Sequence, residues 1–119
     1  MKTRRKVLGD AHVDRAEAGK TDFDSEFQTL ITEGAWGTVW ASDAISLRER
    51  SMLTLALLAA TKNFEEIPMH IRATANTGAS QQDVIAAFQH VAIYAGVPAA
   101  NHAIKLAKQT YAEMESKPA

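Results

Sequence analysis

A nine-residue apolar run constrains the fold of this chain more than any other stretch. Its sequence is MLTLALLAA, from Met52 to Ala60, and Thr54 is its single polar residue. Just before it, Ser46 and Glu49 match the S-x-x-E capping box, in which each side chain accepts a hydrogen bond from the other residue's backbone amide. The pattern predicts a helix that starts at Ser46. With almost no polar face, this helix should be buried on several sides.

A second helix is predicted after a turn at Lys62-Asn63. It opens near Phe64, and Pro68 lies about one turn in, where a missing amide is still tolerated. Gly78 is the expected C-terminal stop. Residues at helical spacing should form the core stripe of this helix: Phe64, Ile67, Ile71 and Ala75. His70 lies off that stripe.

We expect one domain over residues 1–119, with an N-terminal arm over 1–20 and a helical core over 21–115. The arm is polar and should hold at most a short helix around Val13 to Ala18. Trp36 and Trp40 would share a face if their segment were helical. Apolar residues at helical spacing predict the first helix of the core: Phe23, Phe27, Leu30 and Ile31.

The last third of the chain predicts two further helices. Ser80 with Asp83 caps the first of them, and Gly96 ends it. Pro98 suits the first turn of the second. Because no convincing strand is present, we expect an all-α fold of about five or six helices. Two helices that are apolar on most of their surface also predict oligomerisation.

Composition excludes several classes of function. The 119 residues carry a formal net charge of -1, so nothing favours nucleic acid or another polyanion as a partner. The absence of cysteine excludes disulfides, thiolate catalysis and cysteine zinc sites. The apolar run is too short to span a bilayer, and the N-terminus lacks the apolar core of a signal peptide. A cytoplasmic location is the default expectation.

His70 is the strongest candidate for proton transfer near neutral pH. Glu66 precedes it by four residues, Arg72 follows closely, and the preceding apolar helix could desolvate the imidazole. The alternative is an ordinary Glu-His pair on a helix surface. A metal site at Glu66 and His70 would lack a clustered third ligand.

The other histidines have simpler explanations. His102 sits near a helix start and could hydrogen-bond the turn before it. His12 in the arm is exposed unless the arm wraps a neighbouring subunit, and His90 is a structural or surface residue. Arg48 and Arg50 are either solvated charges or fixed guanidiniums that grip a carboxylate.

Three motifs around these residues resemble the carboxymuconolactone decarboxylase family. They are RERSMLTLA over 48–56, EEIPMHIRA over 65–73 and YAGVPAANHA over 94–103. LGDAHVDRA over 8–16 and AWGTVW over 35–40 extend the resemblance over nearly the whole chain, in the same order. The resemblance implies an all-α, alkylhydroperoxidase D-like subunit that assembles into a ring, commonly a hexamer.

The resemblance also separates this chain from the peroxidase branch of its superfamily. There, a C-x-x-C motif precedes the histidine that aligns with His70, and a glutamate of the preceding helix aligns with Glu49. The two cysteine positions are Asn63 and Glu66 here. Peroxidase chemistry would therefore have no nucleophile.

The family reaction implied is decarboxylation of 4-carboxymuconolactone to 3-oxoadipate enol-lactone, a step of protocatechuate (β-ketoadipate) catabolism that should need no cofactor. We hypothesise that His70 donates the proton and that Glu49 or Glu66 orients the His70 imidazole. The alternatives are a paralogue that acts on another small lactone or keto acid and, further off, a non-enzymatic oligomeric ligand-binding protein.

The remaining hypotheses concern binding of a dicarboxylate lactone. Arg72 or Arg48 would hold the acetate side-chain carboxylate, since a bidentate fork fixes orientation. His102 and Tyr94 are candidates to donate to the lactone oxygen. His12 would close the site if the arm folds over it.

Overall fold

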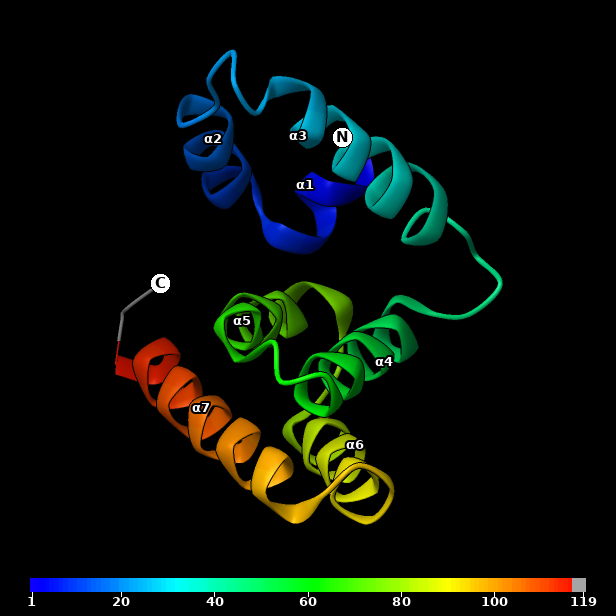
Figure 1. The fold of residues 1–119 in the computed structure, drawn as a ribbon, viewed down its shortest axis with the longest axis vertical. Helices are drawn as coiled ribbons and strands as arrows, with labels where there is room; N and C mark the ends of the chain where they lie inside the picture. The colour runs from blue at the N-terminus through cyan, green and yellow to red at the C-terminus, as the bar shows by residue number, and fades with distance from the viewer. Residues whose placement is uncertain (117–119) are drawn as a thin grey trace. The chain divides into compact units, whose positions relative to one another are not determined.

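The computed structural model describes residues 1–116, and its regular elements are all helices (Figure 1). In chain order they are α1 (Lys2–Leu8), α2 (Asp10–Ala18), α3 (Ser25–Ile31), the π-helix η1 (Thr32–Val39), α4 (Leu47–Ala60), the 3₁₀ turn η2 (Phe64–Glu66), α5 (Ile67–Thr77), α6 (Gln81–Tyr94) and α7 (Val97–Ser116). No strand occurs in this part of the chain. The predicted all-α class is confirmed.

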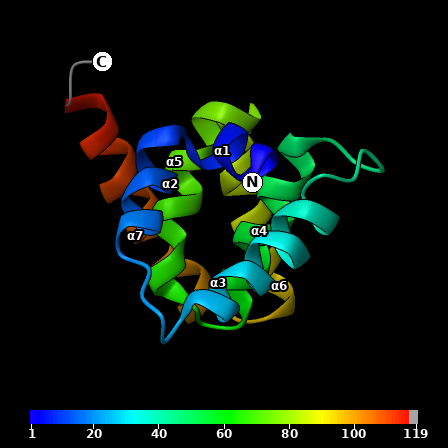
Figure 2. The ribbon, with the colours of Figure 1, turned by 90° about the horizontal axis from the view of Figure 1, so that it is seen from above.

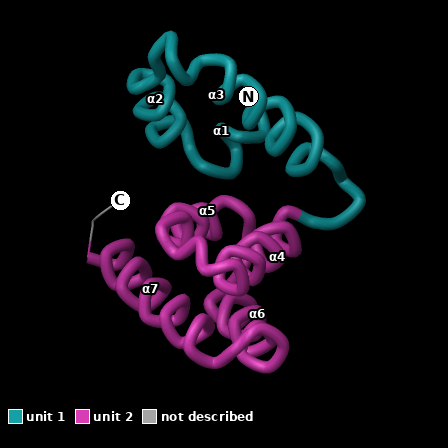
Figure 3. The backbone as a smooth tube through the Cα atoms, in the orientation of Figure 1, with its two compact units in different colours: residues 1–46 teal, residues 47–119 magenta. Residues whose placement is uncertain are grey.

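The chain forms two compact units, coloured separately in Figure 3. The first unit, residues 1–46, holds α1 to α3 and η1, and the second begins at Leu47 and holds α4 to α7. Figure 2 shows the helices from a second direction. All the predicted site residues except His12 belong to the second unit.

The N-terminal arm is more ordered than its polar sequence predicted. It folds into α1 and α2, which raises the number of α-helices in the described residues to seven instead of five or six. Gly9, with φ 90°, makes the turn between them. Arg5 in α1 donates from Nη1 to the carboxylates of Asp10 (3.1 Å) and Asp14 (2.9 Å) in α2. Such pairs between helices leave no periodic signal in a sequence.

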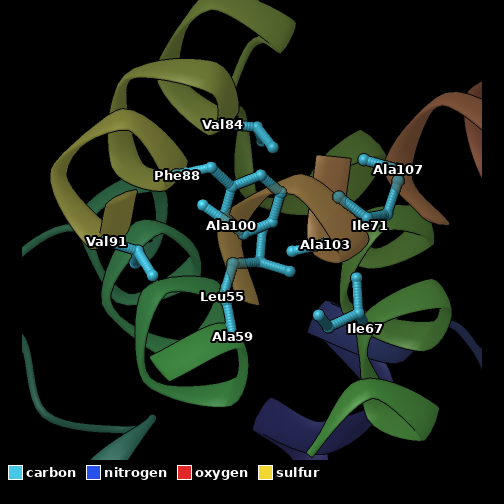
Figure 4. Close-up of a cluster of buried hydrophobic side chains, with 10 residues drawn as sticks. All are labelled: Leu55, Ala59, Ile67, Ile71, Val84, Phe88, Val91, Ala100, Ala103 and Ala107. Atoms are coloured by element: carbon cyan, nitrogen blue, oxygen red, sulfur yellow. The ribbon is translucent and has the colours of Figure 1, made fainter. Parts of the chain in front are cut away.

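The core of the second unit lies where its four helices meet (Figure 4). Leu55 of α4 and Phe88 of α6 are completely buried there. The other members are also apolar: Ala59, Ile67, Ile71, Val84, Val91, Ala100, Ala103 and Ala107. The central helix α4 is buried along one face only, because Leu53 and Leu57 remain 54% and 63% exposed in the chain. Within the chain α4 is therefore covered along one face, and burial of its other sides stays a prediction about the assembly.

A different arc of α5 is buried from the one predicted. Ala75 is exposed, whereas Thr74 is buried beside Ile67 and Ile71. The buried face of α5 is therefore rotated about the helix axis relative to the predicted face. The rotation is smaller than the roughly 100° that separates successive residues of an α-helix. His70, expected beside the stripe, consequently lies inside it.

In the first unit, one prediction about apolar residues is confirmed and one set of apolar residues is unexpectedly exposed. Trp36 and Trp40 share a face as expected, with ring centroids 5.2 Å apart and an interplanar angle of 30°. In contrast, the apolar stripe around α3 is exposed in the chain, from Ile31 at 39% to Phe23 at 99%. No residue of α3 is buried.

Two predicted helix ends in the second unit, at Gly78 and at Ser80, are confirmed. The helix predicted to open near Phe64 instead begins with the 3₁₀ turn η2 before α5, and α6 ends at Tyr94 with Ala95, not Gly96, as its C-cap. Gly78 ends α5 in the left-handed region with φ 86°. Ser80 Oγ accepts from the amide of Asp83 (3.0 Å), and Asp83 Oδ2 accepts from the amide of Ser80 (2.9 Å), which completes the capping box of α6. No helix within residues 1–116 is long and apolar enough to cross a membrane.

We expect Gly78→Ala to lower the free energy of unfolding by about 1–2 kcal/mol, because the backbone of an L-residue is strained at positive φ. A Cβ at this position would meet no atom within 4 Å, so the cost is purely conformational. Gly34→Ala is the matched control, since Gly34 has the same free space without a positive φ. Urea unfolding of the two variants measures the difference. Equal changes in the free energy of unfolding would contradict a strained, left-handed backbone at position 78.

Candidate active site

The N-terminal turn of α4 is anchored to α6 by a bidentate ion pair. Arg48 donates from Nε to Asp83 Oδ2 (2.8 Å) and from Nη2 to Asp83 Oδ1 (2.7 Å). Asp83 is also the capping-box residue of α6, so one carboxylate fixes both helix ends. Arg48, a candidate for gripping substrate, is thus held by a carboxylate of its own chain.

A second anchor ties the same turn to α5. The hydroxyls of Ser51 and Thr77 lie 2.7 Å apart, and both residues are buried. A buried hydroxyl must be hydrogen-bonded to offset its desolvation, so this pair also fixes the register of the two helices. Glu49 and Arg50 lie between the anchored residues Arg48 and Ser51 in sequence.

The Arg48 guanidinium, and then the backbone amide of Ser80, hold the pKa of the Asp83 carboxyl well below its usual range. A lowered pKa in the native state stabilises the fold above the pKa of the unfolded chain, about 3.9. That contribution is lost as the pH falls through the native pKa. We therefore expect the stability difference between wild type and Asp83→Asn to narrow below about pH 4. Urea titrations from pH 2 to 7 test this, and a constant difference would contradict it.

The predicted residues of α5 and η2 lie in different environments. His70 is 8% exposed, whereas Glu66, in the 3₁₀ turn, is exposed. Arg72 is exposed and donates from Nη2 to Glu113 Oε2 of α7 (2.6 Å). The structure thus buries the proposed proton donor and leaves Glu66 and Arg72 at the surface.

The remaining candidates make aromatic contacts. The His102 imidazole of α7 packs against Phe64, with ring centroids 4.1 Å apart. Tyr94, at the end of α6, stacks on His90 at 4.8 Å and is 79% exposed. His12 lies in α2, within the first unit.

Sequence reasoning missed several polar groups in the second unit. Asp83 was recognised as a cap but not as the partner of Arg48, 35 residues away. Thr74 and Thr77 are buried on α5, and burial raises the pKa of the Tyr111 phenol on α7. The helical spacing of His70, Thr74 and Thr77 was the available signal for a polar buried face. Among the residues described, no group of three or more His, Asp or Glu side chains is placed to hold a metal ion.

The helical fold, with a buried histidine on the helix after an apolar one, is consistent with the family suggested by the motifs. The chain belongs to the carboxymuconolactone decarboxylase family, whose model matches residues 25–109. The match contains every predicted site residue except His12.

Individual relatives cover nearly the whole chain. It is 34% identical over 118 residues to 4-carboxymuconolactone decarboxylase of Acinetobacter baylyi, covering 99% of this chain and 88% of the relative. It is 36% identical over 117 residues to nitrosuccinic acid decarboxylase of Metarhizium robertsii, covering 98% and 82%. A 4-carboxymuconolactone decarboxylase of Pseudomonas putida is 57% identical over 37 residues, which are 31% of this chain and 77% of that sequence. Family and relatives together support an activity of the decarboxylase type.

Proposed function

We propose that this protein decarboxylates 4-carboxymuconolactone to 3-oxoadipate enol-lactone without a cofactor. The observation that carries the proposal is the 34% identity to a 4-carboxymuconolactone decarboxylase over 99% of the chain. The buried His70 supplies a group that can move a proton away from bulk water.

The reaction needs one electron sink and one proton. When the ring carboxylate leaves as carbon dioxide, the electrons of its C–C bond pass through the ring double bond to the lactone carbonyl oxygen. A furanolate-like anion forms, and its carbon next to the carbonyl takes a proton from the His70 imidazolium. Water then returns a proton to His70, so the protein ends the cycle unchanged. Donors to the carbonyl oxygen stabilise the charge that develops there.

Of the two arginines, Arg72 is the better candidate for the carboxylate that stays on the product. Its single short contact is with Glu113, in a pair whose side chains are 42% and 60% exposed. Exposed pairs of this kind contribute little stability, so a substrate carboxylate can displace Glu113 at small cost. Arg48 is bound through two nitrogens to a carboxylate that also caps α6, and its release would be costlier.

A second candidate substrate class follows from the nitrosuccinic acid decarboxylase, which is 36% identical to this chain. Nitrosuccinate, like 4-carboxymuconolactone, is a small dicarboxylate. One of its carboxylates lies on the carbon that bears an oxygen-terminated electron sink, the nitro group. Loss of that carboxylate gives a nitronate, which again needs a proton on carbon. The broader proposal is therefore a small dicarboxylate with an electron sink conjugated to the leaving carboxylate.

We also propose that the protein works as a homo-oligomer, with a hexameric ring as the expected form. The support is the apolar surface that the chain leaves exposed, including Leu57 on α4 and Ile93 on α6. Light scattering coupled to gel filtration gives the mass of the assembly directly. A monomeric mass at micromolar concentration would overturn this part of the proposal.

Turnover of the two substrates tests the function. Purified, chelator-treated protein is mixed with 4-carboxymuconolactone or with nitrosuccinate, the ultraviolet absorbance is followed, and carbon dioxide is trapped. Stoichiometric carbon dioxide from the lactone at a catalytic rate is expected. Release from nitrosuccinate alone would move the assignment to the second class, and release from neither by folded protein would favour a non-enzymatic binding protein.

A further inference from the structure

A groove of about 130 Å³ lies between α6 and α7, and we call it the α6–α7 groove. Each helix contributes four lining residues at positions i, i+3, i+4 and i+7, which share one face of a helix. None of these residues is a candidate residue of the active site. Six of them are apolar or aromatic: Val84, Ile85 and Phe88 of α6, and Ile104, Ala107 and Tyr111 of α7.

The size and the lining of the groove suit one six-membered ring. Its most buried residues, Val84, Phe88 and Ala107, belong to the core cluster (Figure 4). Because Ala107 carries only a methyl group, it fills little of the space between the larger side chains. Phe88 and Tyr111 bring two aromatic rings to this space, and aromatic rings favour stacked or edge-to-face contact with another ring. In another protein, an apolar cavity of about 150 Å³ binds benzene.

The two remaining lining residues are polar and exposed: Gln81 at the start of α6 and Lys108 on α7. Among the described residues, neither side chain forms a hydrogen bond or an ion pair with the rest of the chain. No carboxylate lines the groove, and Asp83, the acidic residue nearest to Gln81 in sequence, is bound by Arg48. Burial raises the pKa of the Tyr111 phenol, so that group adds no negative charge near pH 7. An apolar groove with one cation at its edge is complementary to an apolar anion.

We propose that the α6–α7 groove binds a small aromatic monocarboxylate, with its ring against Phe88 and Tyr111 and its carboxylate at Lys108 and Gln81. The Lys108 ammonium attracts the anion, and the Gln81 amide can donate a hydrogen bond to it. The ligand should carry a single carboxylate, because a second one would lie against the apolar lining without a partner, and burial of an unpaired charge is costly. This site is independent of the proposed decarboxylation, whose substrates are dicarboxylates.

Methyl NMR of the full chain, with benzoate as the probe, locates the site. Ile85 and Ile104 line the groove, whereas Ile93 on α6 is 79% exposed and lies outside it. We expect benzoate to shift the methyl signals of Ile85 and Ile104, because the ring current of a bound ring acts only at short range. The signal of Ile93 should stay in place. Titration of the shifts gives Kd for wild type and for each variant.

Two neutral partners test the contact between the charges. Benzamide has the shape of benzoate without its charge, and Lys108→Gln removes the charge on the protein. Benzoate should bind Lys108→Gln about two- to fivefold more weakly than wild type, the range of an exposed ion pair, while Kd for benzamide should not change. Lys105→Gln is the matched control, since Lys105 is exposed on the same helix and does not line the groove. Terephthalate, which has a second carboxylate at the far end of the ring, should bind at least about tenfold more weakly than benzoate.

Two kinds of result would overturn the proposal. If Lys108→Gln weakens benzoate and benzamide equally, or acts no more strongly than Lys105→Gln, Lys108 does not hold the carboxylate. If millimolar benzoate shifts neither the Ile85 nor the Ile104 methyl signal, the groove is not a site for this ligand class. A smaller mass of the assembly in Lys108→Glu would then assign the groove to a second copy of the chain. These measurements need no substrate, so their failure is distinct from a failure of the proposed function.

Discussion

His70→Gln is expected to lower kcat by about 10²- to 10⁴-fold, the usual contribution of a positioned proton donor. The glutamine amide is polar and of similar size, so it can occupy the buried position of His70 on α5, but it cannot release a proton at neutral pH. Turnover of 4-carboxymuconolactone, together with circular dichroism and the mass of the assembly, measures the effect on an intact protein.

The matched control for this experiment is His90→Gln. His90 is exposed on α6 and stacks on Tyr94, so its loss should leave kcat within about twofold of wild type and stability within about 0.5 kcal/mol. If His70→Gln is folded and turns over substrate at nearly the wild-type rate, His70 is not the proton donor. The group that supplies the proton would then have to be sought elsewhere in the site.

Leu55→Ala is expected to lower the free energy of unfolding by about 2–5 kcal/mol. Leu55 is completely buried and packs with Phe88 at the centre of the second unit (Figure 4). Truncation removes apolar contacts and leaves a cavity that the surrounding helices can fill only in part. Urea unfolding at a fixed protein concentration measures the loss.

Leu57→Ala gives the same chemical change on the same helix at a position that is 63% exposed. In the dissociated subunit its cost should stay below about 1 kcal/mol, since little apolar surface is removed from contact within the chain. The comparison with Leu55→Ala is therefore made at a protein concentration at which the proposed oligomer, whose interface would cover Leu57, is dissociated. Equal destabilisation by the two variants would contradict the assignment of one buried face to α4. The pair therefore tests which face of α4 is buried within the subunit.

Helix ends were predictable because their chemistry is local. Gly78 and the Ser80–Asp83 capping box act within a few residues of the positions that they terminate or start, and both are in place. α4 starts directly after Ser46, as the S-x-x-E pattern predicted. The all-α class follows from these signals, because the stretches between the caps carry helical periodicity.

The environment of each candidate site residue could not be predicted in the same way. Arg48 and Arg72 were expected to be available to substrate, yet each is bound by a carboxylate 35 or 41 residues away. His70 was placed off the core stripe of its helix, and the structure puts it among the buried residues of α5. These outcomes depend on which helices pack together and at what rotation.

The sequence by itself determined the helical class, the helix ends at Gly78 and Ser80 and the family, because capping, periodicity and ordered motifs are properties of neighbouring residues. Only the tertiary structure decided that Asp83 binds Arg48, that Ser51 binds Thr77 and that one face of α4 alone is buried in the chain. The physical reason is that a side chain's partner across helices depends on helix rotation to within a fraction of a turn, and many rotations satisfy the same local pattern.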